Sequence, residues 1–265
     1  MRLTLVLKTL RGRWKNAVGW GGALVAMTTM QLYIYPSIQK SGDAMDQFIN
    51  VFPKEMIAMF RIEDYTSAVG FLGTELFSMM IPLVFLGLGA SWGASAGAEE
   101  EERGTSEVIY ALPISRTRVL VSKLVALWVI LLAIAVVEYC VLVVGASIVD
   151  LDLTKVHLVA GLASSVGIGL FFNGLALVTA SGTGSRGLAL GLAIGVALLS
   201  FLVFSLAPMV DSFDAILPAM PFEWALGKSP LKDGFDWVGL GCLGLGALVC
   251  YGTALLLLNR RDLDA

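Results

Sequence analysis

The chain has 265 residues, of which 57% are hydrophobic and 15% are charged. Because a soluble domain carries about 25% charged residues, this composition excludes an ordinary soluble domain and indicates an integral membrane protein. The formal net charge of −3 says little about partners, since charges on the two sides of a bilayer must be counted separately. We expect no nucleic-acid partner.

The sequence predicts no catalytic, cofactor or metal site within this chain. His157 is the only histidine, so neither a histidine-based metal cluster nor a Ser/His/Asp triad elsewhere in the chain can form. The three cysteines lie inside apolar runs and are interpreted as buried hydrophobic residues. No G-x-x-x-x-G-K-[ST] loop occurs, so the chain has no phosphate-binding loop of its own.

Residues 1–16 predict an amphipathic helix lying in the membrane interface. Leu3, Leu7, Leu10 and Trp14 share one helical face, and the cations Lys8, Arg11 and Lys15 share another. The alternative is a cationic leader that only fixes the orientation of the chain.

Six apolar segments then predict an all-α membrane protein with six transmembrane helices. A span requires about 20 apolar residues, and the expected spans are residues 17–36, 72–98, 119–149, 157–182, 187–209 and 236–259. The fourth and fifth spans are separated only by the sequence SGTGSRG around Arg186, which predicts a tight turn. We treat residues 1–265 as a single transmembrane domain.

The distribution of lysine and arginine predicts the orientation. With the N-terminus inside, most of the 18 cations fall in cytoplasmic segments. The sequence therefore predicts a multi-pass protein of the plasma (inner) membrane with both termini in the cytoplasm. Residues 99–118 then form a cytoplasmic segment between the second and third spans.

Glu138 is the one carboxylate deep within a predicted span. An ionisable group in the membrane is a functional hypothesis by default, because its burial is costly unless it is paired or hydrated. Glu138 could line a translocation path or relay a proton. The favoured interpretation is structural, a hydrogen bond to a neighbouring helix.

Small residues recur at a four-residue spacing in two of the spans. Such stripes allow close helix approach. For the stripe in the second span, at Gly89, Gly93 and Gly97, packing within the chain is expected. The stripe in the fifth span is the candidate for a subunit interface, at Gly187, Gly191 and Gly195.

The segment 99–118 begins with four consecutive glutamates, which cannot enter lipid and therefore end the second span. A short helix is expected over 105–112, ended by Pro113, with Ser115 capping the third span. Such a short charged helix at the membrane surface could serve as a docking element for a soluble partner. The alternative is a solvated loop.

The sequence EEEERGTSEVIYALPISRTRVLVSK resembles the signature of ABC-2 type permeases, the membrane subunits of a class of ABC exporters. That family has an E-x-x-x-G-T element, then an apolar-Pro-[IV]-Ser-Arg turn and a lysine, matched here by Glu100, Gly104, Thr105, Leu112, Pro113, Ile114, Ser115, Arg116 and Lys123. The ending LLLLNRRDLDA also resembles the family. The outer loop resembles, more loosely, the multidrug or antibiotic-export branch.

The resemblance implies a permease that moves a hydrophobic or amphiphilic substrate by alternating access. It implies two kinds of partner: cytoplasmic ABC ATPase subunits, which bind the ATP and Mg²⁺, and a second permease copy or sister permease. Residues 99–112 of this chain would form a coupling helix that sits in a groove of the ATPase. The residues that would contact the ATPase are Glu99, Glu100, Glu101, Glu102, Arg103, Gly104, Thr105, Glu107, Pro113 and Arg116.

Three other functions stay open from the residues alone. The chain could be a proton-driven carrier, a membrane anchor that docks a soluble partner without transport, or, least favoured, a membrane enzyme. The near absence of buried charge disfavours the carrier.

Overall fold

The structure is a computed structural model that describes residues 2–42, 47, 49, 51–59, 64–102, 104, 115–151 and 153–260. The described residues are almost entirely helical and contain no strand. The predicted all-α class is therefore confirmed.

Five helical stretches are long and apolar enough to cross a membrane. The first is a continuous stretch, Ala68–Glu102, built from α4 (Ala68–Leu72), the π-helical segment η1 (Gly73–Met80) and α5 (Ile81–Glu102). The other four are formed by α7 (Arg116–Ile148), α8 (Lys155–Thr183), α9 (Arg186–Leu206, continued by the 3₁₀ turn η2, Ala207–Met209) and α12 (Trp237–Arg260). These stretches correspond to the second through sixth predicted spans.

The N-terminal region differs from the prediction. A single helix, α1 (Arg2–Lys40), replaces the predicted interfacial helix and separate first span, and it is not among the five stretches apolar enough to cross a membrane. No proline interrupts this helix before Pro36, so nothing in the backbone imposes the expected break near residue 16. At 1.5 Å per residue, α1 is about 58 Å long. Its role as a sixth span remains a prediction.

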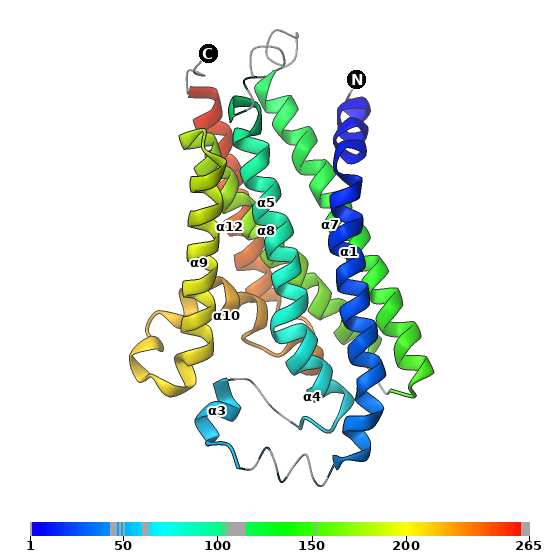
Figure 1. The fold of residues 1–265 in the computed structure, drawn as a ribbon. Coiled ribbons are helices and arrows are strands. Elements are labelled where there is room, and N and C mark those ends of the chain that lie inside the picture. Colours follow the sequence, from blue (N-terminus) through cyan, green and yellow to red (C-terminus); the bar gives the residue numbers. More distant parts are fainter. Residues whose placement is uncertain are drawn as a thin grey trace.

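The long helices run alternately up and down the bundle (Figure 1). Both chain termini lie at one end of the bundle, together with the end of α5; we call this the termini end. Helix α8 is central and packs against α5, α12, α9 and α7, whereas α1 packs along α7. The turn from α8 to α9 also lies at the termini end.

The contact between α5 and α8 brings the two backbones together. A Cβ atom on Gly89 would lie 2.1 Å from the carbonyl oxygen of Gly169, and one on Gly93 would lie 2.2 Å from that of Asn173. Only glycine permits this approach, so the stripe in the second span packs within the chain, as predicted.

The α8–α9 turn confirms that residues 156–210 form two helices. Gly184 adopts a left-handed conformation (φ 66°) that ends α8. The hydroxyl of Ser185 then accepts a hydrogen bond from the Leu188 amide at 3.3 Å and caps α9.

The opposite end of the bundle carries the short elements. These are α3 (Lys54–Met59), two 3₁₀ turns, η3 (Asp211–Phe213) and η4 (Leu217–Ala219), and the short helices α10 (Pro221–Leu226) and α11 (Pro230–Asp233). Prolines at residues 208, 218, 221 and 230 begin four short elements of the 207–233 segment, as expected of a residue that starts but does not continue helices.

Candidate functional site at the acidic end of helix α5

The four glutamates Glu99–Glu102 form the last turn of α5. The helix therefore extends past Ala98, where the second span was expected to end. Carboxylates are unfavourable at a helix C-terminus, because that end of the helix dipole is negative. Their positive partners on other helices compensate for this.

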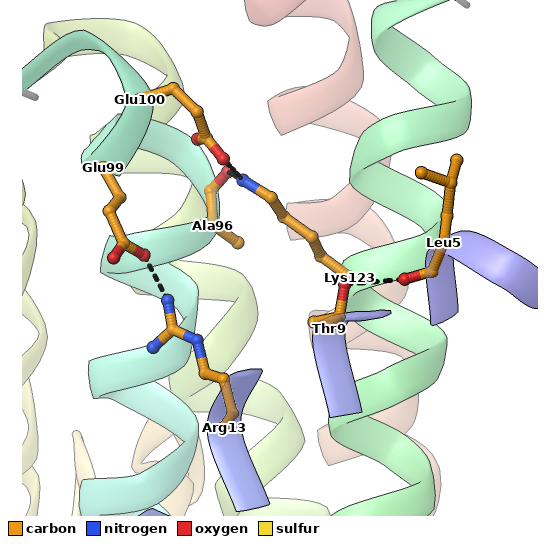
Figure 2. Close-up of polar contacts among 7 residues, drawn as sticks. All are labelled: Leu5, Thr9, Arg13, Ala96, Glu99, Glu100 and Lys123. Atoms are coloured by element: carbon orange, nitrogen blue, oxygen red, sulfur yellow. Dashed lines mark hydrogen bonds and ion pairs between the residues drawn. The ribbon is translucent and has the colours of Figure 1, made fainter. Parts of the chain in front are cut away.

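Glu99 forms an ion pair with Arg13 of α1 (Figure 2). The side chains are 20% and 23% exposed, so the pair is partly shielded from water. The Arg13 guanidinium also lies 5.1 Å from the ring centroid of Trp92, in cation–π geometry. Arg13 thus connects α1 to two points on α5.

Glu100 forms an ion pair with Lys123 of α7, at 2.5 Å from Nζ to Oε1. The same ammonium donates to the carbonyl oxygen of Ala96 at 3.1 Å, near the end of α5 (Figure 2). These partners place a cation at the negative end of the α5 dipole and hold α7 against it.

Glu102 contacts the start of a third helix. Its Oε1 accepts a hydrogen bond from the Arg186 backbone amide at 2.7 Å, at the first residue of α9. An anion is favourable there because the N-terminal amides of a helix lack intrahelical partners. The chain turns directly after the four glutamates. The carbonyl oxygen of Glu101 accepts a hydrogen bond from the Gly104 amide at 3.0 Å.

One helical turn of α5 therefore binds α1, α7 and α9. A small cavity of about 40 Å³ lies beside the two ion pairs, lined in part by Arg13, Trp92, Lys123 and Asn173. The buried Trp92 Nε1 has no hydrogen-bond partner among the described residues. The cavity is large enough for about one water molecule that could accept from it.

The start of α7 is also tied to the end of α12. Ser115 caps α7, as predicted, by accepting from the Arg118 amide at 3.3 Å. The Arg116 guanidinium donates to the carbonyl oxygen of Leu258 at 3.1 Å, and Asn259 Nδ2 donates to Thr117 Oγ1 at 3.4 Å. Arg116, expected to contact a partner, thus also stabilises this helix–helix junction.

The structure leaves the predicted ATPase contact as a prediction. Arg103, Thr105, Glu107 and Pro113 lie outside the described residues, as does the expected helix over 105–112. Gly104 is described and adopts a left-handed conformation (φ 63°) directly after the acidic turn. The sequence interpretation missed Arg13 and Lys123 as partners of the glutamates: it used both to assign orientation, and Lys123 also as part of the family resemblance.

Glu138 of α7 is fully buried. Thr28 of α1 donates a hydrogen bond to its Oε1, and Oε2 has no hydrogen-bond partner within the described part of the chain. The hydrogen bond joins two neighbouring helices, and the choice between a structural and a translocation role for Glu138 stays a prediction.

The glycine stripe on α9 differs from the one on α5 in having no neighbouring helix packed against it among the described residues. No atom lies within 4 Å of a Cβ placed on Gly191 or Gly195, and the nearest to one on Gly187 is the Ser185 hydroxyl at 4.0 Å. This face of α9 is therefore open within the described chain.

The bundle of apolar helices defines a multi-pass membrane protein. Comparison with protein families then identifies its class: the model of the ABC-2 family transporter proteins matches residues 3–263. The chain belongs to this family, whose members are transmembrane permease subunits that partner with an ABC ATPase in a membrane complex. A comparison with curated proteins finds no match.

Proposed function

We propose that this chain is the membrane-spanning subunit of an ATP-driven exporter that moves a hydrophobic or amphiphilic substrate across the plasma membrane by alternating access. A separate ATPase subunit binds ATP and Mg²⁺ and hydrolyses the nucleotide. The termini end of the bundle faces the cytoplasm, and residues 99–118 receive the force from the ATPase.

The acidic turn of α5 is the observation that supports this assignment. It leads directly into the segment expected to dock the ATPase, and it binds Arg13 of α1, Lys123 of α7 and the Arg186 amide of α9. A displacement of the segment would therefore act on four helices together. A loop that only connects two spans would not require these connections.

The test is copurification with the ATPase encoded beside this chain, followed by measurement of ATP hydrolysis in lipid. The informative variant is Glu107→Arg, because Glu107 lies in the predicted coupling helix. Removing all four glutamates would also disconnect α1, α7 and α9 from α5, so a loss of ATPase binding in that variant could not be assigned to the docking segment. A matched control is Asp211→Arg, an exposed carboxylate of η3, one of the short elements at the opposite end of the bundle.

We expect the wild-type chain and Asp211→Arg to retain the ATPase, and Glu107→Arg to retain less of it. If the wild-type chain retains no ATPase, the assignment is wrong. If the ATPase is retained but no hydrophobic or amphiphilic compound alters its turnover, a membrane anchor without transport becomes the better assignment.

The open face of α9 is the surface proposed to contact the second permease. Gly191 and Gly195 have room for close approach by another helix. Cysteines introduced at these two positions should crosslink between permeases in native membranes. A cysteine at Gly241 of α12, which is equally open, serves as the control. Equal crosslinking at Gly241 would refute this interface.

A further inference from the structure

A partly open cavity of about 370 Å³ is lined by residues of α4, η1, α10 and α11. Helices α4 and α10 lie at the end of the bundle opposite the termini (Figure 1). The volume of the cavity falls within the range of small-molecule sites, about 300–1,000 Å³. One wall comes from α4 and η1, and the other comes from α10, α11 and the turn between them. It is far from the acidic turn of α5.

Apolar side chains form most of both walls. Val69 and Phe77 contribute from the α4–η1 side, and Leu226, Pro230 and Leu231 from the α10–α11 side. Such walls suit an apolar body, because each buried methylene group stabilises a complex by about 0.8 kcal/mol.

The η1 wall has an unusual backbone. Gly73–Met80 is π-helical, a conformation that is found frequently at functional sites. Glu75 of this segment does not line the cavity; its carboxylate accepts from Tyr65 Oη at 2.6 Å and from Gln31 Nε2 at 3.3 Å. Burial and this bond to Glu75 raise the pKa of Tyr65 above its ordinary value.

Two of the hydroxyl groups that line the cavity, those of Ser67 and Ser78, have already used their hydrogens; Thr74 and Ser229 also line it. Ser78 Oγ donates to the carbonyl oxygen of Gly73 at 2.8 Å, and Ser67 Oγ donates to that of Asp64 at 2.9 Å. A carbonyl oxygen can only accept, so these hydroxyls offer the cavity acceptor lone pairs. Because they are acceptors, they favour a ligand that supplies hydrogen-bond donors.

The rim carries charges of both signs. Asp64 lines the cavity before α4, and Lys232 lines it from α11; both are exposed. Net charge alone therefore does not select the ligand head; the oxygens of Ser67, Ser78 and Asp64 favour a head that donates hydrogen bonds. A primary ammonium group has three donors and can also interact with the Asp64 carboxylate.

We propose that this cavity binds an amphiphile with an apolar body and a hydrogen-bond-donating head, of which a primary amine is the best fit. The proposal rests on the proposed export function, in which the cavity would hold substrate at the outward end of the bundle. The binding measurement that tests it, however, requires neither ATP nor the ATPase.

Binding is measured with the full chain in phosphatidylcholine nanodiscs. The probe is dansylcadaverine, a fluorescent primary amine, and the signal of empty nanodiscs is subtracted. We expect saturable binding that octylamine displaces. Octyltrimethylammonium has the same charge and chain but no N–H donor, and it should displace the probe poorly. Non-saturable binding, or equal displacement by both compounds, would overturn the proposal.

Gly73→Leu tests the location of the site. A Cβ on Gly73 would meet only Leu231 Cδ2, at 3.9 Å, an ordinary contact, and a longer side chain would occupy the cavity. The affinity should fall by about fourfold for each methylene contact displaced. The matched control is Gly241→Leu, which adds the same side chain to an open surface of α12 and should leave affinity unchanged.

Asp64→Asn tests the rim. Asparagine tolerates the left-handed backbone at this position (φ 46°) and removes the charge. Affinity for the probe should fall about two- to fivefold, the effect of an exposed ion pair.

Thermal unfolding and ATPase copurification identify variants that fail to fold. If Gly73→Leu folds, retains the ATPase and binds the probe as the wild type does, this inference is overturned and the proposed function is unaffected. If the wild-type chain binds no ATPase, the proposed function fails whatever the probe shows.

Discussion

Helix α5 meets its neighbours in two different ways. Against α8, glycines bring the backbones into contact, and Asn173 Nδ2 donates to the Gly89 carbonyl oxygen at 2.9 Å. Against α1 and α7, the long side chains of Arg13 and Lys123 reach the glutamates at its end. A backbone contact cannot adjust without separating the helices, whereas long ion-paired side chains can follow a shift. The α5–α8 pair is therefore the fixed unit, and α1 and α7 are the elements that can move against it.

The largest expected effect on stability comes from adding one methyl group at the backbone contact between α5 and α8. Gly93→Ala would place a Cβ 2.2 Å from the Asn173 carbonyl oxygen, so the backbones would have to separate. We expect a loss of about 3 kcal/mol in the free energy of unfolding, measured in mixed detergent micelles. Gly241→Ala is the control, since a Cβ there meets nothing within 4 Å. Similar behaviour of the two variants would contradict the close packing.

The next effect concerns the polar contact that joins α12 to the fixed unit. Tyr251 Oη lies 3.1 Å from both Asn173 Oδ1 and the Leu170 carbonyl oxygen. Tyr251→Phe removes the hydroxyl and keeps the ring, so it should cost about 1 kcal/mol in the same unfolding measurement. A matched control is Tyr33→Phe, because Tyr33 is 85% exposed. An equal effect in the two variants would show that the Tyr251 contact contributes nothing.

The two kinds of contact also differ in how far the sequence predicts them. The glycine stripe of α5 repeats every fourth residue and lies within one span, so helical periodicity alone predicts a packing face. The turn at Gly184 and the cap at Ser115 follow from local residue preferences. Five spans follow from hydrophobic length.

The partners of the glutamates could not be predicted in the same way. Arg13 and Glu99 are separated by 86 positions, and Lys123 and Glu100 by 23. No periodicity relates such residues, and either cation is explained equally well by membrane orientation. The continuity of α1 was missed because a surface helix and a span have similar residue patterns. The π-helical segment was missed because no residue pattern marks it.

Breaking the ion pair between α1 and α5 should alter the coupling of ATP hydrolysis to substrate more than it alters the stability of the protein. Arg13→Glu opposes two carboxylates, and Glu99→Arg opposes two cations, so each single variant should lower stability by about 0.5–1 kcal/mol. The double variant restores opposite charges, and a double-mutant cycle measures their interaction. We expect each single variant to reduce substrate-stimulated ATP hydrolysis and the double variant to recover part of it. No recovery would mean that the pair does not connect α1 to α5.

The smallest effect separates two roles of the last glutamate. Glu102 accepts a hydrogen bond from the Arg186 amide at the start of α9, and the amide oxygen of glutamine can accept the same bond. Glu102→Gln should therefore cost only a few tenths of a kcal/mol, the charge contribution at an exposed helix end, whereas Glu102→Ala should cost about 0.5–1 kcal/mol.

Both variants of Glu102 are compared with the wild type in two measurements, the free energy of unfolding and the binding of the ATPase. If Glu102 only anchors α9, Glu102→Gln should bind the ATPase as the wild type does, and Glu102→Ala should show any loss. If the ATPase recognises the negative charge, both variants should bind it less well although glutamine preserves the fold. Equal stability of the two variants would show that the bond to Arg186 contributes nothing. The acidic turn would then contribute to stability through its ion pairs with α1 and α7.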